Sequence, residues 1–95
     1  MFDIELKSEA VEQLKRIKRH YAAQIVNSIE KHLKVTPDKP SPPRIKILRG
    51  RQRAAYRLRE GDYRIFYDIA ESRVTVIAIL HKSETENFYL KEEPS

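Results

Sequence analysis

The stretch YRLREGDYRIFY, residues 56–67, decides the fold of this chain. Two runs of strand-forming residues flank Gly61-Asp62, and a glycine at the first central position of a two-residue turn is typical of a β-hairpin. With this turn, Leu58 faces Ile65 and Arg59 faces Arg64 across the hairpin. Side chains alternate between the faces of a strand, so the hairpin has two different faces. The predicted core face carries Tyr56, Leu58, Ile65 and Tyr67, and the other face carries Arg57, Arg59, Arg64 and Phe66.

The second face of this hairpin is strongly basic. A single arginine of this kind is most often solvated or paired with a carboxylate. From residue 44 to residue 67, however, eight Lys or Arg are accompanied by only two acids, Glu60 and Asp62. Guanidinium groups bind phosphates in bidentate fashion and stack on bases, so the segment predicts a surface for RNA or DNA. The predicted contacts to RNA are Arg49, Arg51, Arg53, Arg59 and Phe66.

The composition predicts one small basic domain, residues 1–95. The formal net charge is +5 and charged residues make up 35% of the chain, which favours polyanionic partners, although solubility alone could explain such a charge. Without cysteine, the chain can form neither a disulfide nor a thiolate metal site. No segment is apolar enough for a signal peptide or a membrane span, so we expect a cytoplasmic protein that does not enter a membrane.

The first third of the chain predicts a strand and two helices. Residues 2–6 alternate between apolar and acidic side chains, as a half-buried strand does. Ser8 is placed to cap the helix that follows. Apolar residues at helical spacing then continue to about Val35. One helix over residues 8–34 would be about 40 Å long, too long for so small a domain, so we expect two helices with a bend near His20.

The remaining residues predict a sheet. Residues 36–43 contain four of the five prolines and predict an extended, stiff connector. Strands are expected at residues 44–48, on both sides of the Gly61-Asp62 turn as far as Ile69, and at residues 74–80, whose apolar run is typical of a central strand. The order β-α-α-β-β-β-β predicts an α+β fold, in which two N-terminal helices pack on one face of a mainly antiparallel sheet of four to five strands.

The sequence carries no familiar catalytic motif. A glycine-rich phosphate loop, an HExxH motif and a Ser-His-Asp set are all missing, and His20, His32 and His81 lack the spacing of metal ligands, so we expect no metal and no cofactor. His81 follows the apolar strand and is expected near the arginine face, where it is either functional or a structural histidine bonded to the backbone. Tyr89 is either a core anchor or a ring that stacks on a base.

These segments resemble the RelE/ParE superfamily of toxins from type II toxin–antitoxin systems. The resemblance depends on residues 48–50 (LRG), on residues 56–67, on the apolar strand that leads to His81-Lys82, and on Phe88-Tyr89. It implies a RelE-like toxin domain over the whole chain. It also implies a cognate antitoxin as partner, in a hetero-oligomer.

The resemblance implies three alternative functions. The first, which we take as the primary expectation, is a ribosome-dependent mRNA interferase. Such toxins cleave mRNA in the ribosomal A site by attack of the ribose 2′-hydroxyl on the phosphate, without a metal. The second is a ParE-like inhibitor of DNA gyrase. The third is a catalytically impaired toxin that acts with its antitoxin in autorepression.

The resemblance also implies roles for particular residues. Arg64 matches the family's phosphate-binding arginine. Arg57 stands where RelE has one of two catalytic lysines, and Ala55 stands at the other; the guanidinium stays protonated, so it is a poor base. His81 is then the best candidate for the base, because an imidazole exchanges protons near neutral pH. The candidate catalytic residues are Arg57, Arg64, His81, Lys82 and Tyr89.

Overall fold

The computed structural model describes residues 1–41, 43–50 and 53–89 of the chain, without the side chains of Asn87 and Tyr89. The described residues form a five-stranded sheet in the order β1-β5-β4-β3-β2. β1 runs parallel to β5, and all other neighbours are antiparallel. The strands are β1 (Asp3–Leu6), β2 (Ile45–Ile47), β3 (Tyr56–Glu60), β4 (Tyr63–Ala70) and β5 (Arg73–His81).

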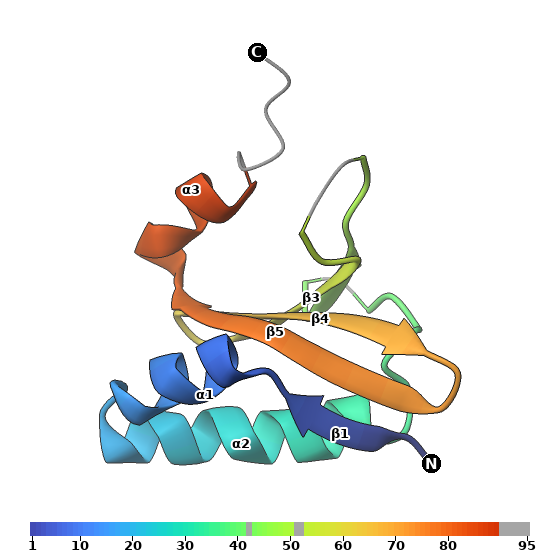
Figure 1. The fold of residues 1–95 in the computed structure, drawn as a ribbon, viewed down its shortest axis with the longest axis horizontal. Coiled ribbons are helices and arrows are strands. Elements are labelled where there is room, and N and C mark those ends of the chain that lie inside the picture. The colour runs from blue at the N-terminus through green and yellow to red at the C-terminus, as the bar shows by residue number, and fades with distance from the viewer. Residues whose placement is uncertain (42, 51–52, 90–95) are drawn as a thin grey trace.

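Two helices cover one face of this sheet. They are α1 (Ser8–Lys15) and α2 (Arg19–Leu33), which lie side by side beneath the strands in Figure 1. A 3-10 turn, η1 (Lys82–Glu84), and a short helix, α3 (Thr85–Tyr89), rise from the opposite side of the sheet. The predicted α+β architecture and its element order are therefore confirmed, with the C-terminal helical segment as an addition. None of the helices in the described part is long and apolar enough to cross a membrane.

The central hairpin has the predicted register. Leu58 pairs with Ile65 and Arg59 pairs with Arg64 across β3 and β4. Gly61 has a φ of 56°, a left-handed value that costs glycine little and explains why glycine occupies the turn. The side chains of Leu58 and Ile65 are fully buried against the helices. The alternation in residues 56–67 thus determined which face became the core.

The main core lies between the helices and the sheet. Ile25, Ile29 and Leu33 of α2 and Ala10 of α1 pack against apolar side chains from β2 to β5. The buried strand residues in this cluster are Ile45, Leu58, Ile65, Tyr67, Val74, Val76 and Ile79. Burial of this much apolar surface is the main force that holds the helices on the sheet.

The two predicted helices are confirmed, and they separate at residues 16–18, just before the predicted bend near His20. Two other local predictions about the N-terminal half were wrong. Ser8 is the first residue of α1 and not its cap: Lys7 occupies the N-cap position and caps no N–H with its side chain. The connector after α2 contains turns instead of one extended run. Pro37 is buried there, and its carbonyl accepts a hydrogen bond of 2.7 Å from the Tyr67 hydroxyl.

A second, smaller core lies on the other face of the sheet. Phe66 of β4 is fully buried and stacks on Phe88 of α3, with ring centroids 4.1 Å apart. Ala54 and Ala78 complete this cluster. The expectation that Phe66 stands exposed beside the arginines is therefore wrong, because α3 covers its ring. Only the part of this face nearer the Gly61-Asp62 turn and β2 is left to the basic side chains.

Candidate functional site

Basic side chains from β2, β3 and β4, and from the residues just before β2 and just after β5, lie on the sheet face opposite α1 and α2. Arg59 pairs with Arg64 on one side and, through its N–H, with the Arg44 carbonyl on the other, at 2.8 Å. In the next row of the sheet, Lys46 pairs with Arg57. Beyond the end of β5, the Lys82 ammonium lies 3.5 Å from the Asp62 carboxylate at the turn. We call this group the cationic face: Arg44, Lys46, Arg57, Arg59, Arg64 and Lys82.

The guanidinium groups of the cationic face differ in how firmly they are held. Arg57 Nη2 donates a hydrogen bond of 2.8 Å to the Pro43 carbonyl, and its buried Nε has no hydrogen-bond partner among the described residues. Arg64 Nη1 donates to the carbonyls of Gly61 (3.1 Å) and Tyr63 (3.0 Å), which ties this side chain to the turn. Arg59 is exposed. It lines an open hollow of about 550 Å³ together with Arg44.

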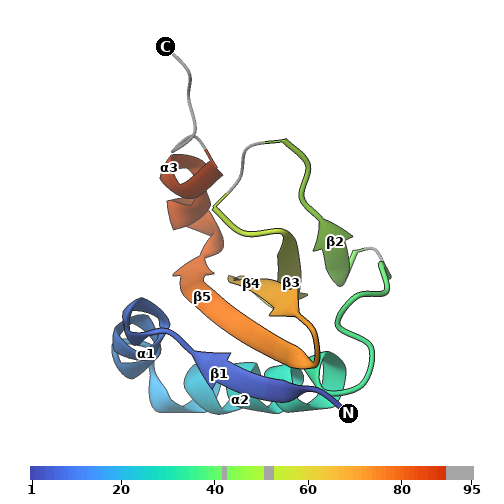
Figure 2. The same ribbon diagram turned by 45° about the vertical axis from the view of Figure 1, so that its right-hand side comes forward.

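Arg53 does not belong to the cationic face. Its guanidinium forms an ion pair of 3.2 Å with Glu9 of α1 and lies 4.6 Å from the centre of the Phe88 ring. Arg53 therefore joins α1 and α3 to the connection between β2 and β3, and Figure 2 shows α3 and that connection on the same side of the sheet. Ala55, where the family resemblance places a lysine, anchors the connection through an N–H that donates to Asp68 Oδ1 at 2.7 Å.

The structure does not test the roles that were predicted for three other site residues. Arg49 is exposed in the segment that follows β2 and does have a partner within the structure. Arg51 lies outside the described residues, and so does the side chain of Tyr89. The RNA contacts proposed for Arg49 and Arg51, and the substrate contact proposed for Tyr89, stay predictions.

His81 lies on the helix side of the sheet, away from the cationic face. It pairs with Tyr63, whose ring meets the imidazole edge-on at 5.3 Å, and Tyr63 in turn lies 6.0 Å from the Tyr21 ring of α2. Arg64 is the next residue along β4, so its side chain leaves the strand on the opposite face. The expectation that His81 lies at the mouth of the arginine face is therefore wrong. The alternation of side chains separates the two groups.

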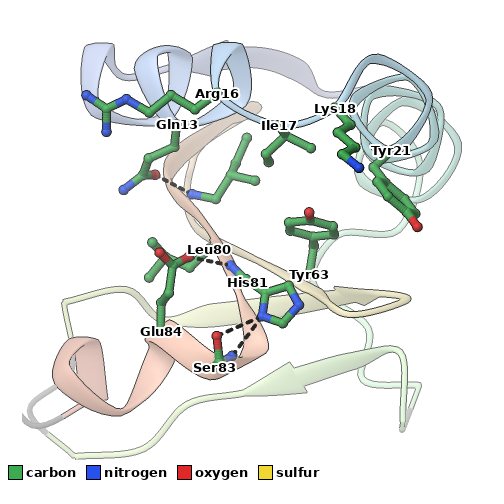
Figure 3. A pocket seen from close by; sticks show the side chains of 11 residues that line it. Gln13, Arg16, Ile17, Lys18, Tyr21, Tyr63, Leu80, His81, Ser83 and Glu84 are labelled. Carbon is green, nitrogen blue, oxygen red and sulfur yellow. Dashed lines mark hydrogen bonds between the residues drawn. The ribbon is translucent and has the colours of Figure 1, made fainter.

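The backbone holds His81 in a capping role. Its Nδ1 accepts a hydrogen bond from the Ser83 N–H at 3.1 Å, and its own N–H donates to Glu84 Oε1 at 2.9 Å (Figure 3). The Ser83 hydroxyl also lies 2.9 Å from Nδ1, so the backbone and the side chain of the same residue both hold this ring nitrogen. This geometry corresponds to the structural interpretation of His81, in which the histidine starts the turn η1.

A cleft of about 520 Å³ opens beside His81, between the α1–α2 connection and the end of β5. Figure 3 shows Lys18 and Tyr21 at one side, Gln13 at the other, and Tyr63 and His81 across from the helices. A second hollow of about 250 Å³ continues past Tyr21, Tyr63 and His81 toward the Gly61-Asp62 turn. Sequence analysis did not predict this cleft, because its rings, Tyr21, Tyr63 and His81, come from three separate elements.

The field of the cationic face reaches His32 at the end of α2. Burial lowers the pKa of His32, and the charges of Arg44 and Lys31 lower it further, while Glu60 opposes them.

Nothing in the described part of the chain resembles a metal site, because it contains no cluster of three His, Cys, Asp or Glu side chains. Sequence analysis did not name Arg44 and Lys46 among the predicted site residues. The alternation of residues 44–48 nevertheless places both side chains on the same face of the sheet as Arg57.

Comparison with known proteins gives both a family and a fold. The sequence model of a family described as "ParE toxin of type II toxin-antitoxin system, parDE" matches residues 4–86. No curated protein matches the sequence.

Several solved structures share the fold at low sequence identity. The RelBE2 toxin–antitoxin complex of Mycobacterium tuberculosis gives a TM-score of 0.72 at 21% identity, over 84% of this chain and 96% of that one. The RelB–RelE complex of Methanococcus jannaschii gives 0.66 at 22% identity, over 88% and 96%. The RelE–RelB complex of Pyrococcus horikoshii OT3 gives 0.64 at 16% identity, over 87% and 97%. These likenesses establish a RelE-like fold.

Proposed function

This chain belongs to the ParE toxin family of type II toxin–antitoxin systems, and we propose that it is a toxin that inhibits DNA gyrase and cuts no RNA itself. One observation favours gyrase inhibition over mRNA cleavage, the two activities of the superfamily. The cationic face has groups that bind phosphate, whereas His81, the group expected to accept a proton, lies on the other side of the sheet.

RNA cleavage by 2′-hydroxyl attack needs a base as well as positive charge. The cationic face supplies four guanidinium groups and two lysine side chains. Asp68 leaves β4 on the same side, but its Oδ1 accepts the Ala55 N–H at 2.7 Å and holds the β2–β3 connection in place. Ala55 itself occupies the position of a lysine in the RelE pattern. The described groups of this face thus favour binding over proton transfer.

A polyanion is the natural partner of the cationic face. Arg44 and Arg59 lie at an open hollow, whereas Arg57 and Arg64 are tied to backbone carbonyls, so bound phosphates would meet two guanidinium groups that are already held in place. In the proposed mechanism the face contacts the DNA that gyrase holds, or an acidic surface of the enzyme. Binding of this kind weakens as salt is added, because counterions compete for the same charges.

The second candidate is the mRNA interferase of our primary expectation. It is favoured by Arg64, which matches the family's phosphate-binding arginine, and by the positive charge that Arg57 keeps where RelE has a lysine. The fold shared with toxins of three RelB–RelE complexes favours it too. In that case the proton acceptor must come from outside the described side chains or from the ribosome.

A pair of assays on the purified chain separates the candidates. The first measures DNA supercoiling and DNA breakage by gyrase, and the second maps cuts in ribosome-bound mRNA by primer extension. We expect inhibited supercoiling, accumulated gyrase-linked breaks and an intact message. Sharp cuts within codons without an effect on gyrase would establish the second candidate instead. Activity in neither assay would leave the impaired toxin that acts in autorepression.

The proposal includes a cognate antitoxin in a stable complex with the toxin. Each of the three similar structures named above is a complex of a toxin with its antitoxin. Co-expression of the protein encoded beside this chain should restore the growth of cells that produce the toxin. Failure of that protein to form a complex with the chain would contradict the assignment.

A further inference from the structure

The Gly61-Asp62 turn holds two members of the cationic face through its backbone carbonyls. The Lys82 N–H donates a hydrogen bond of 2.7 Å to the Asp62 carbonyl, which fixes the residue after β5 beside the turn. Arg64 Nη1 donates to the Gly61 carbonyl at 3.1 Å. The turn therefore gathers Lys82 and Arg64 at one end of the cationic face, next to Asp62.

The Asp62 side chain adds a negative charge at this end. Its carboxylate lies 3.5 Å from the Lys82 ammonium, and the two side chains are 64% and 57% exposed. An ion pair as exposed as this adds little to stability. The hydrogen bond between the backbones of the two residues joins them without it. The main effect of the carboxylate is therefore on the ligands that approach the face.

The end of the cationic face at β2 differs in its charge balance. Arg44 and Arg59 line an open hollow there, and neither side chain has a hydrogen bond or an ion pair to a described residue. Glu60 also borders this hollow, but it pairs with Tyr63 and so leaves β3 on the helix side. The field of an exposed charge is screened by salt within about 8–10 Å. The Asp62 carboxylate thus acts most strongly on phosphates close to Lys82.

We propose that Asp62 limits the affinity of the cationic face for DNA, because its carboxylate neutralises Lys82 and repels phosphates at the turn. The inference rests on the polyanionic partner of the proposed function and not on gyrase as the target. A face that binds free DNA weakly favours a target that adds contacts of its own, such as DNA held by a protein. Asp62 is in this way a specificity-determining residue.

The test measures the affinity of purified variants for a short, fluorescently labelled duplex DNA by anisotropy over a range of salt concentrations. Asp62→Asn removes the charge and keeps the size of the side chain and the backbone carbonyl that Lys82 binds. It should bind about fivefold more tightly at low salt, the effect of one unit charge about 4 Å away in water. Since the freed Lys82 adds about one phosphate contact, log K should fall more steeply with log salt, by about 0.9 in slope.

Two further variants separate this local effect from a change in net charge. Glu71→Gln makes the same change of charge at the exposed turn after β4, at the far end of that strand from Asp62, and should alter the affinity less than about twofold. Lys82→Met should weaken binding more in the Asp62→Asn background than in the wild type, a coupling that a double-mutant cycle measures. Thermal unfolding checks that each variant is folded, as expected for exposed positions.

Two results would overturn the inference alone. Equal affinities for wild type and Asp62→Asn, or equal gains for Asp62→Asn and Glu71→Gln, would mean that the carboxylate does not act locally on the face. Equal losses for Lys82→Met in both backgrounds would mean that Asp62 does not neutralise Lys82.

The variant Arg59→Ala tests the proposed function separately in the same assay. It should weaken DNA binding whatever the role of Asp62, because Arg59 belongs to the cationic face and is exposed. If Arg59→Ala binds the duplex as tightly as the wild type, the cationic face is not the DNA-binding surface. The polyanionic partner then fails, and the inference about Asp62 fails with it.

Discussion

The side-chain oxygen Oε1 of Gln13 accepts a hydrogen bond of 2.6 Å from the backbone N–H of Ile79. β1 pairs with β5 only as far as Val76, and the Lys7 N–H donates the last bond of that edge to the Val76 carbonyl. Beyond this point α1 lies along β5, and Gln13 takes the place of the missing strand. One side chain thus closes the edge of the sheet and fixes α1 beside the cleft.

Gln13→Ala should destabilise the protein by about 1–3 kcal/mol, because it leaves the half-buried N–H of Ile79 without an acceptor. Gln13→Glu keeps an oxygen at the same place and should cost less. Urea unfolding followed by circular dichroism measures both. Equal costs for the two variants would mean that the acceptor oxygen is not what matters at this position.

Tyr67→Phe should also cost about 1–3 kcal/mol of unfolding free energy, because the buried Pro37 carbonyl loses its donor. Tyr56→Phe is the matched control. The Tyr56 ring stacks on Tyr67 at 5.3 Å, but its hydroxyl has no hydrogen bond to a described residue. Chemical denaturation of the two variants should therefore give clearly different midpoints. Similar midpoints would show that the Tyr67 hydroxyl adds nothing to stability.

Alkaline pH should unfold the protein partly through Tyr67. Burial raises the pKa of the Tyr67 phenol above its usual value of 10.0, and the neighbouring Tyr56 and Asp38 raise it further. In the unfolded chain the phenol ionises near pH 10, so its contribution to stability is complete below that pH and is lost as the pH rises toward the higher folded value. Unfolding free energies measured across pH 10 should fall less steeply for Tyr67→Phe than for wild type. Parallel curves would contradict this account.

Arg59→Ala and Arg64→Ala should differ in stability although both weaken the cationic face. The side chain of Arg59 is exposed and has no hydrogen bond or ion pair to a described residue, so its loss should leave the melting temperature unchanged. Arg64 donates to the Gly61 and Tyr63 carbonyls, so its loss should cost about 1 kcal/mol. Both variants should inhibit growth and gyrase less, with a shallower dependence on salt. Full toxicity of both would exclude the cationic face as the functional surface.

His81→Gln should keep most of the toxicity. The glutamine oxygen can accept the Ser83 N–H in place of Nδ1, and the cationic face on the other side of the sheet is unchanged. Growth inhibition and the gyrase assay should both be within about twofold of wild type, as expected for a change outside the binding surface. Loss of toxicity by a hundredfold or more, as when a catalytic group is removed, would restore His81 as the base of an mRNA interferase.

The sequence by itself determined the hairpin and its two faces. Strict alternation in residues 56–67 and a glycine at the turn allow only one register that buries Leu58 and Ile65 together. The same alternation places Arg57, Arg59 and Arg64 on one surface. Helical spacing of apolar residues likewise determined that two helices cover the core face. These features depend on neighbours in the chain, so the chain itself is enough to predict them.

Tertiary structure alone decided what surrounds each predicted site residue. The folding of α3 onto the sheet buried Phe66, and the approach of α1 and α3 to the β2–β3 connection drew Arg53 away from the cationic face. The pairing of His81 with Tyr63 turned the imidazole to the helix side. In each case the partner is distant in sequence. Which distant groups meet depends on how whole elements pack, a property that no local pattern of residues contains.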